Sequence, residues 1–263
     1  MKKLADEDIL LRSEADGVAT LTLNRPAARN ALSTGLMAAL QTELDAIAAD
    51  RSVRVVVIAA NGPAFCAGHD LREVRATPTR DAYEALFAQC SALMLSITRL
   101  PQPVIARVHA TATAAGCQLV ATCDLAVAAE SARFATPGVN IGLFCSTPMV
   151  AVSRNLGRKQ TMEMLLTGEM IDAETARAGG LVNRVVPEAG LDAAIDAYCA
   201  QIASKSALTL KIGKEAFYRQ LDMPLEDAYT FASDTMVTNM LARDAEEGID
   251  AFLEKREPRW RDE

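Results

Sequence analysis

The sequence is poor in aromatic residues, which make up 5% of the chain, and it has no excess of basic residues. Lysine and arginine number 27 against 34 aspartates and glutamates, which gives a net charge of −7 at pH 7. An acidic chain lacks the basic stripe that nucleic-acid binding requires, so we expect no nucleic-acid partner. A small basic pocket for a phosphorylated ligand stays open as an alternative.

Features of membrane and secreted proteins are also missing. One uncharged run, at 108–123, contains His, Thr and Gln and is shorter than the about 20 apolar residues of a transmembrane helix. We expect no membrane span. The N-terminal MKKLADEDIL turns acidic at once and predicts no signal peptide. The six cysteines are scattered through a chain large enough to fold without disulfides, which predicts reduced thiols.

Common catalytic motifs are absent as well. No GxGxxG follows a predicted strand, and neither a Walker A loop nor a GxSxG elbow occurs. The chain has two histidines, His69 and His109, and nothing in the sequence marks a nucleophile beside either. Cys66 and His69 lack the further ligands of a zinc site, so we expect no metal.

What is present predicts an α/β fold. Strands and helices alternate through residue 190 and helices alone follow, which predicts a core at 1–190 and a helical module at 191–263. The apolar pattern predicts strands at 18–23, 53–60, 104–108, 125–129 and 183–186. It predicts helices at 36–49 with Ser33 as N-cap, then at 81–98, 114–123, 191–203, 206–220, 224–242 and 244–255. Glycine and proline at 134–148 indicate a structured loop.

Two loop-to-helix junctions have the composition of a ligand-binding backbone. The first, AFCAGHDLR at 64–72, leaves a buried strand through small residues that allow a ligand close to the main chain. The second, ATAAGCQ at 112–118, enters a helix whose first N–H groups can hold an oxyanion. Either junction alone is equally typical of a tightly packed turn, but the pair favours an anion site.

Both junctions resemble the crotonase (enoyl-CoA hydratase/isomerase) superfamily, and the resemblance covers nearly the whole chain. The further matching segments are NRP…RNAL at 24–32, AGCQLVATCDLAVAAESARFATPGVNIGL at 115–143, MLLTG at 164–168, AGGLVNRVVP at 178–187 and GIDAFLEKR at 248–256. The resemblance implies a ββα spiral core, a C-terminal helical trimerisation module, and homotrimers or dimers of trimers. It implies an acyl-CoA thioester as ligand, with coenzyme A as part of the substrate and no separate cofactor. The corresponding location is the cytoplasm for a bacterial protein and the mitochondrial matrix for a eukaryotic one.

The resemblance also implies roles for individual residues. Backbone N–H groups of His69 and Ala115 would hold the thioester oxygen, where negative charge collects when an enolate forms. The adenine pocket would use the backbone of Ala64, Phe65 and Ala67. Residues that match coenzyme A contacts are Arg29, less securely Arg25 and Arg72, and in the tail Phe252 and Lys255. A solvated surface charge is the alternative for each of these Arg and Lys residues.

The sequence departs from the family at the two glutamates that hydratases use for proton transfer. The first falls on Gln118 and the second on Gly138. Glutamine cannot take a proton at neutral pH and glycine supplies no group, so we expect hydration of crotonyl-CoA to be weak or absent. A carboxylate position of some other members maps approximately to Ser146.

Other side chains leave the chemistry open. The ring of His69 is the side chain best suited to proton transfer near pH 7, although the backbone role of this residue does not require the ring to face the substrate. Cys145 is a candidate nucleophile, but no base is evident and a buried structural thiol is the alternative. Two functions follow: a lyase- or isomerase-type enzyme acting on acyl-CoA by an undetermined reaction, or a non-catalytic acyl-CoA-binding or regulatory protein.

Overall fold

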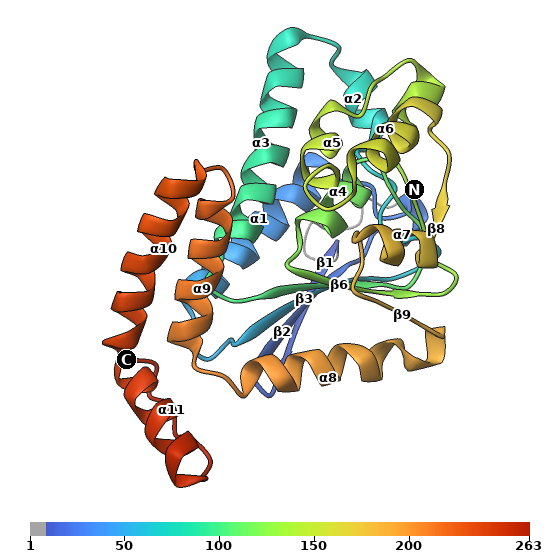
Figure 1. Ribbon diagram of the computed structural model, residues 1–263. Helices are drawn as coiled ribbons and strands as arrows, with labels where there is room; N and C mark the ends of the chain where they lie inside the picture. The colour runs from blue at the N-terminus through green and yellow to red at the C-terminus, as the bar shows by residue number, and fades with distance from the viewer. Residues whose placement is uncertain (1–8) are drawn as a thin grey trace.

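The computed structural model describes residues 9–263, so most of the segment on which the signal-peptide expectation rests lies outside the described residues. Two sheets form its centre (Figure 1). The six-stranded sheet has the order β1-β2-β3-β4-β6-β9, and the three-stranded sheet has the order β5-β7-β8. The strands are β1 Leu10–Ala15, β2 Val18–Leu23, β3 Val55–Ala60, β4 Val104–Val108, β5 Ala112–Thr113, β6 Leu125–Ala129, β7 Arg133–Ala135, β8 Ile171–Asp172 and β9 Arg184–Val186.

The chain winds between the two sheets. Strands β4 and β6 pair in the large sheet, while β5 and β7 pair in the small one, and β9 returns to the large sheet after β8. Pairing is parallel except in the β1–β2 hairpin and between β7 and β8. This alternation is the predicted spiral, and the mixed α/β class is confirmed.

Helices cover both faces of the large sheet, which buries every residue of β3. Helices α1 Thr34–Ala49, α3 Arg80–Arg99 and α4 Ala115–Thr122 pack on one face. Helix α8 Leu191–Ala203 crosses the opposite face, where Leu191, Ile195 and Cys199 pack on the valines of β3 (Figure 1). The predicted helical module at 191–263 therefore begins with a helix that packs directly on the large sheet.

Local sequence determines several element boundaries. The Ser33 hydroxyl accepts a hydrogen bond from the Leu36 N–H (3.1 Å), which confirms the predicted N-cap of α1. Strand β1 was not expected, since its residues are mostly exposed and polar. The expected loop at 134–148 is partly wrong: β7, a 3₁₀ helix at Pro137–Ile141 and the start of α5 Ser146–Val152 lie there. Strand β7 depends on pairing with β5 and β8, which local composition does not indicate.

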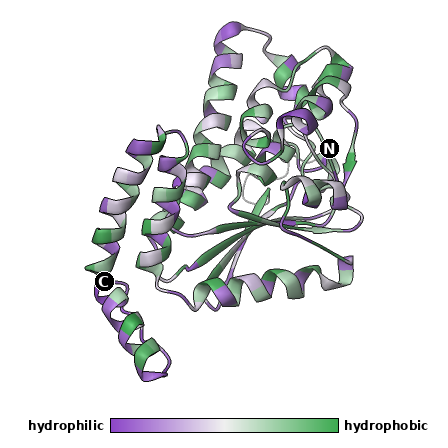
Figure 2. Ribbon diagram, viewed as in Figure 1, coloured by the Kyte–Doolittle hydropathy of each residue, from purple (hydrophilic) through white to green (hydrophobic). Residues whose placement is uncertain are grey.

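The remaining helices extend the fold beyond the sheets. They are α2 Leu71–Ala76, α6 Arg158–Thr167, α7 Ala173–Gly179, α9 Ala207–Gln220, α10 Leu225–Met240 and α11 Arg243–Glu254. Figure 2 shows apolar strands at the centre, and both apolar and polar residues along the C-terminal helices. None of the helices within residues 9–263 combines the length and apolar character needed to cross a membrane.

A buried ion pair fastens α9 to the core. The Lys214 ammonium lies 2.6 Å from the carboxylate of Asp124 and donates to the carbonyls of Ile97 (3.0 Å) and Gln102 (2.9 Å). The other carboxylate oxygen of Asp124 accepts a hydrogen bond from the Tyr218 hydroxyl (2.8 Å). Two residues of α9 thus converge on one carboxylate directly before β6.

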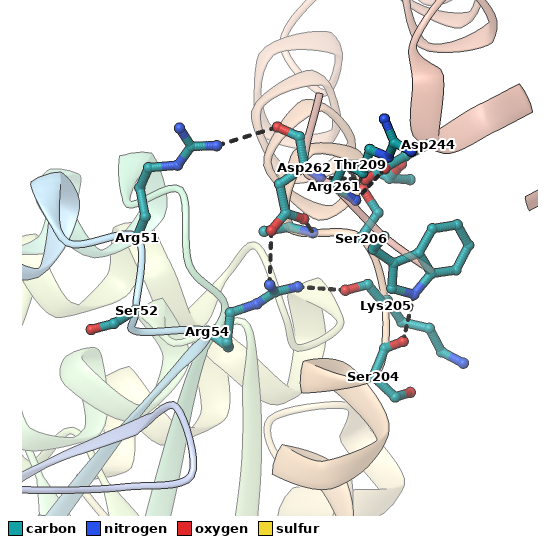
Figure 3. Close-up of polar contacts among 12 residues, drawn as sticks. Arg51, Ser52, Arg54, Ser204, Lys205, Ser206, Thr209, Asp244, Arg261 and Asp262 are labelled. Carbon is teal, nitrogen blue, oxygen red and sulfur yellow. Dashed lines mark hydrogen bonds and ion pairs between the residues drawn. The ribbon is translucent and has the colours of Figure 1, made fainter. Parts of the chain in front are cut away.

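The C-terminal tail returns to the core in a second polar network (Figure 3). Asp244, at the start of α11, is buried and accepts hydrogen bonds from the backbone N–H groups of Arg261 (2.7 Å) and Asp262 (3.0 Å). The Asp262 carboxylate pairs with Arg54 (2.9 Å) and accepts from the Ala207 N–H (2.6 Å). The tail therefore connects α11, α9 and the segment before β3.

Candidate active site

The loop after β3 contains His69, which forms a parallel β-bridge with Leu32. The Leu32 N–H donates to the Gly68 carbonyl (2.7 Å), and the Asp70 N–H donates to the Leu32 carbonyl (3.2 Å). Since Leu32 bonds both neighbours of His69, the N–H of His69 points away from it in this parallel bridge.

On its other side the loop pairs with the segment that leads into α4. The Thr113 N–H donates to the Cys66 carbonyl (2.9 Å), and its hydroxyl donates to the Ala67 carbonyl (3.1 Å). Sequence reasoning missed Thr113, whose hydroxyl ties the two junctions together.

Helix α4 begins at this contact. Ala114 precedes it with φ +50° and ψ −121°, a conformation that residues with a Cβ rarely adopt. The first helical bond runs from the Gln118 N–H to the Ala114 carbonyl (3.0 Å), so the N–H of Ala115 has no acceptor in its own helix.

Two glycines allow the junctions to touch. A Cβ atom on Gly68, at φ +94°, would lie 2.8 Å from the Cβ of Ala114 and 3.3 Å from the nitrogen of Ala115. A Cβ on Gly116 would lie 2.2 Å from the carbonyl oxygen of Cys66. The loop and the start of α4 are thus packed backbone to backbone. Within residues 9–263 the N–H groups of His69 and Ala115 donate no hydrogen bond, so both are open to an acceptor.

Gln118 lies one turn into α4 and is buried. Its side-chain oxygen is 4.0 Å from the thiol of Cys90 on α3. The amide therefore faces the space between α3 and α4, next to the junction.

Gly138 is also buried, in the 3₁₀ helix. A Cβ there would lie 2.7 Å from the carbonyl oxygen of Leu143 and 2.9 Å from the sulfur of Cys145. The Gly138 carbonyl itself accepts from the Leu143 N–H (2.9 Å). The position therefore lacks space for any side chain as well as lacking a carboxylate.

The remaining candidate nucleophiles have no activating partner among the described residues. Cys145 is buried, and burial raises the pKa of its thiol. The exposed Ser146 hydroxyl donates to the Phe144 carbonyl (3.3 Å). Burial likewise raises the thiol pKa of Cys66 and Cys117 to about 12 each. All these thiols are protonated at neutral pH.

The His69 ring stands edge-on against Phe87 of α3, with centroids 5.7 Å apart and planes at 80°. Both ring nitrogens are buried, and neither has a hydrogen-bond partner within residues 9–263. Burial lowers the pKa of His69, and the nearby Leu32 carbonyl opposes this shift. The ring is therefore neutral at pH 7. In the described part of the chain, no three His, Cys, Asp or Glu side chains are grouped to hold a metal ion.

Arg25, predicted to contact coenzyme A, is engaged within the chain. Its guanidinium donates to the Asp70 carboxylate (2.9 Å) and to the Ala31 carbonyl. Burial alone would raise the pKa of Asp70, but the hydrogen bonds from Arg25 and from the Arg72 N–H outweigh this effect and lower it. The ion pair fastens the 25–31 turn to the loop that carries His69.

Sequence reasoning also missed Asn30, which is fully buried. Its amide donates to the carbonyls of Asn61 (2.7 Å) and Ala64 (2.8 Å), and its side-chain oxygen accepts from the Arg25 N–H (2.8 Å). At φ +53° its backbone is left-handed, a conformation that asparagine tolerates. An Asn in a turn of the NRP…RNAL segment was the available signal.

Most backbone groups expected in the adenine pocket already have partners. The Phe65 N–H donates to the Thr111 carbonyl (2.9 Å), and the Ala67 N–H donates to the Arg29 carbonyl (3.1 Å). The side chains of Arg29 and Arg72 are exposed and make no hydrogen bond or ion pair to the described residues. These two guanidinium groups are free to meet a ligand.

Phe252 and Lys255 lie elsewhere in the chain. Phe252 is 82% exposed on α11, and Lys255 ends that helix at φ +55°. Helix α11 lies at the opposite end of the molecule from α2 and well away from α4, which lies near the centre (Figure 1). The structure does not bring these two residues to the junction of their own chain.

Comparison with known proteins adds to this geometry. A family model described as enoyl-CoA hydratase/isomerase matches residues 13–263. The human mitochondrial enoyl-CoA hydratase domain-containing protein 3 is 47% identical over 247 residues, which cover 94% of this chain and 82% of the human protein. The 2,3-dehydroadipyl-CoA hydratase of Escherichia coli K12 is 37% identical, covering 95% of this chain and 97% of its own. The crystal structure of a Mycobacterium smegmatis enoyl-CoA hydratase is 57% identical and superposes with a TM-score of 0.94, covering 96% of this chain and 98% of that one.

Proposed function

Since the chain belongs to the enoyl-CoA hydratase/isomerase family, we propose that it binds an acyl-CoA thioester and holds the thioester oxygen between the N–H groups of His69 and Ala115. The packing of Gly68 against the start of α4 supports this proposal, because it brings the residue before His69 next to the nitrogen of Ala115, and neither N–H donates a hydrogen bond within the described residues. Donors fixed in this way stabilise the oxyanion of an enolate without having to reorient during the reaction.

Coenzyme A would approach along the loop that contains Ala64, Phe65 and Ala67. The unpaired guanidinium groups of Arg29 and Arg72 would then lie near its phosphates. Arg25 would act indirectly, by holding the loop through Asp70.

Ordinary hydration would be weak or absent. Adding water across an enoyl-CoA double bond needs a group that removes a proton from water and a group that delivers one to the α-carbon. Gln118 can only orient a water molecule, and position 138 has no space for a replacement carboxylate. The retained chemistry would be that of the enolate, of the lyase or isomerase type.

The active form would be an oligomer, a trimer or a dimer of trimers. Large apolar residues are exposed along α10, α11 and the turn between them, among them Tyr229, Met236, Leu241, Phe252 and Leu253. A second copy covering them would remove this apolar surface from water. Because α11 lies far from the junction of its own chain, Phe252 and Lys255 would serve the nucleotide bound by a neighbouring copy. Sedimentation velocity tests the assembly, and a monomer at micromolar concentration would contradict it.

The test of function has two arms. Calorimetry with butyryl-CoA and crotonyl-CoA measures binding, and mass spectrometry in D₂O detects deuterium at the α-carbon or a changed product. Binding with exchange supports the proposed enolate chemistry. Binding with neither exchange nor product favours the alternative, a non-catalytic acyl-CoA-binding protein. Rapid crotonyl-CoA hydration, above about 1 per second, would contradict the proposed loss of hydratase activity.

A further inference from the structure

The imidazole of His69 and the side chain of Gln118 both contact helix α3. The ring contacts Phe87, and Cys90 contacts the Gln118 amide. Phe87 and Cys90 are three residues apart on α3 and therefore share one face of this helix. The ring and the amide thus contact neighbouring turns of the same helix face.

The nitrogens of the buried His69 ring have no hydrogen-bond partner within residues 9–263. A neutral imidazole carries one donor and one acceptor, and here both nitrogens are buried without a partner in the described part of the chain. Buried polar atoms without partners are unfavourable, so the surroundings favour a ligand that supplies the missing hydrogen bond. The N–H of the same residue belongs to the proposed oxyanion pair, so an acyl group bound there would be held by the residue that carries the ring.

We propose that the His69 imidazole is the proton-transfer group of this site and takes a proton from the α-carbon of a bound acyl-CoA thioester. The inference rests on the proposed function, since it needs the thioester oxygen at the N–H groups of His69 and Ala115. The bond between the α-carbon and hydrogen breaks, and the proton bonds to a neutral ring nitrogen. The released electron pair forms the carbon–carbon double bond of the enolate, while the carbonyl π pair moves onto the thioester oxygen.

The reverse transfer completes the reaction. The imidazolium returns its proton, or a deuteron after exchange with D₂O, to the α-carbon. In a β,γ-unsaturated chain it can instead deliver the proton to the γ-carbon, which moves the double bond. Neither route needs an oxidant, a reductant or a second substrate.

The neighbouring groups are poorly suited to accept a proton from the α-carbon. Gln118 on α4 and Gly138 carry no titratable side chain, and burial raises the pKa of Cys90 on α3 to about 11 and that of Cys66 in the loop to about 12. Asp70, the next residue in the loop, is held as a carboxylate by Arg25.

Two substitutions of His69 separate the ring from the backbone donor, because both keep the N–H. His69→Ala removes the ring, and His69→Phe keeps an aromatic ring against Phe87 while removing both nitrogens. Full-length proteins are first tested for butyryl-CoA binding by calorimetry, then for deuterium incorporation at the α-carbon in D₂O. We expect both variants to bind butyryl-CoA within a few-fold of the wild-type affinity. Their rate of deuterium exchange at the α-carbon should fall by about 100-fold or more.

The second histidine supplies the control. The His109 ring lies 2.8 Å from the Gly62 carbonyl, and His109→Gln should exchange at the wild-type rate. In the wild type, exchange should fall as the pH is lowered through the folded-state pKa of His69, which burial places below its ordinary value, because the imidazole then becomes charged.

The outcomes separate the two proposals. Equal exchange by the wild type and His69→Phe overturns the role of the ring and leaves the proposed function standing. A wild type that binds butyryl-CoA without exchange overturns both proton transfer and enolate chemistry, but not thioester binding. Absence of binding overturns the proposed function and this inference together. As an independent measurement, ¹⁵N NMR should show the ring nitrogens of His69 shifting when butyryl-CoA binds, and unchanged nitrogens in the complex would also overturn the inference.

Discussion

The carbonyl oxygen of Leu143 occupies the space that a side chain at Gly138 would need. A Cβ atom at 138 would come within 2.7 Å of this oxygen. The oxygen belongs to backbone that hydrogen-bonds Gly138 itself, so it cannot turn aside as a flexible side chain would. The local packing therefore excludes a glutamate, or any other side chain, at position 138.

We predict that hydratase activity cannot be restored by side-chain replacement alone. The double variant Gln118→Glu with Gly138→Glu should not hydrate crotonyl-CoA at a typical enzyme rate, and Gly138→Ala should already destabilise the fold by about 1–3 kcal/mol through overpacking. Urea denaturation measures this loss. The matched control is Gly213→Ala on α9, where a Cβ meets nothing within 4 Å and which should gain up to about 1 kcal/mol. A stable, active double variant would contradict this account of position 138.

A methyl group at Gly116 should separate the two junctions. Its Cβ would lie 2.2 Å from the Cys66 carbonyl oxygen, so Gly116→Ala must push the loop away from α4. We expect butyryl-CoA affinity to fall at least tenfold, because the two N–H donors no longer converge. Calorimetry measures the affinity and circular dichroism confirms folding. Unchanged affinity in a folded variant would show that the backbone contact does not shape the site.

Removing the Lys214 ammonium should leave the Asp124 carboxylate buried without its cation. Breaking a buried pair from one side costs about 3–5 kcal/mol, so Lys214→Met should lower the free energy of unfolding by that order. The double variant Asp124→Asn with Lys214→Met should recover part of the loss, because no charge remains to desolvate. Chemical denaturation of all variants completes the cycle. Additive losses would show that the two residues are not coupled.

The stability of the protein should depend on pH through His69. Burial lowers its pKa in the folded state, so between that value and about 6.5 the unfolded chain binds more protons than the folded one. The stabilisation is complete above about pH 6.5 and is lost as the pH falls through the folded pKa. Denaturation of the wild type and His69→Phe between pH 5 and 8 should show a flatter profile for the variant. Parallel profiles would mean that the ring is not desolvated.

The tail network should stabilise the C-terminal helices. Asp244 accepts two backbone hydrogen bonds from the tail, so Asp244→Ala leaves both donors without their partner and should cost about 1–3 kcal/mol (Figure 3). Asp250→Ala, an exposed aspartate of the same helix, is the control and should change stability by less than about 0.5 kcal/mol. Thermal unfolding compares the two. Equal effects would show that the tail contacts are not specific.

Features that depend on short-range sequence patterns could be predicted from the sequence. The alternation of strands and helices, the Ser33 cap and the fully buried β3 are encoded within windows of a few residues, and the structure confirms them. The glutamine at 118 and the glycine at 138, which carry no carboxylate, are likewise visible in the sequence. The two small-residue junctions are also visible in the sequence. Where two backbone segments approach closely, each position tolerates only a small side chain, and this restriction can be seen at each position separately.

Only the tertiary structure decided how these pieces meet. The pairing of Arg25 with Asp70, the packing of α8 on β3 and the absence of space at Gly138 each depend on residues brought together by the fold. The remoteness of α11 from its own junction has the same origin, since local periodicity fixes that a helix forms but not where it packs. Sequence thus determined which residue types were available, and the long-range packing decided which of them were free to act.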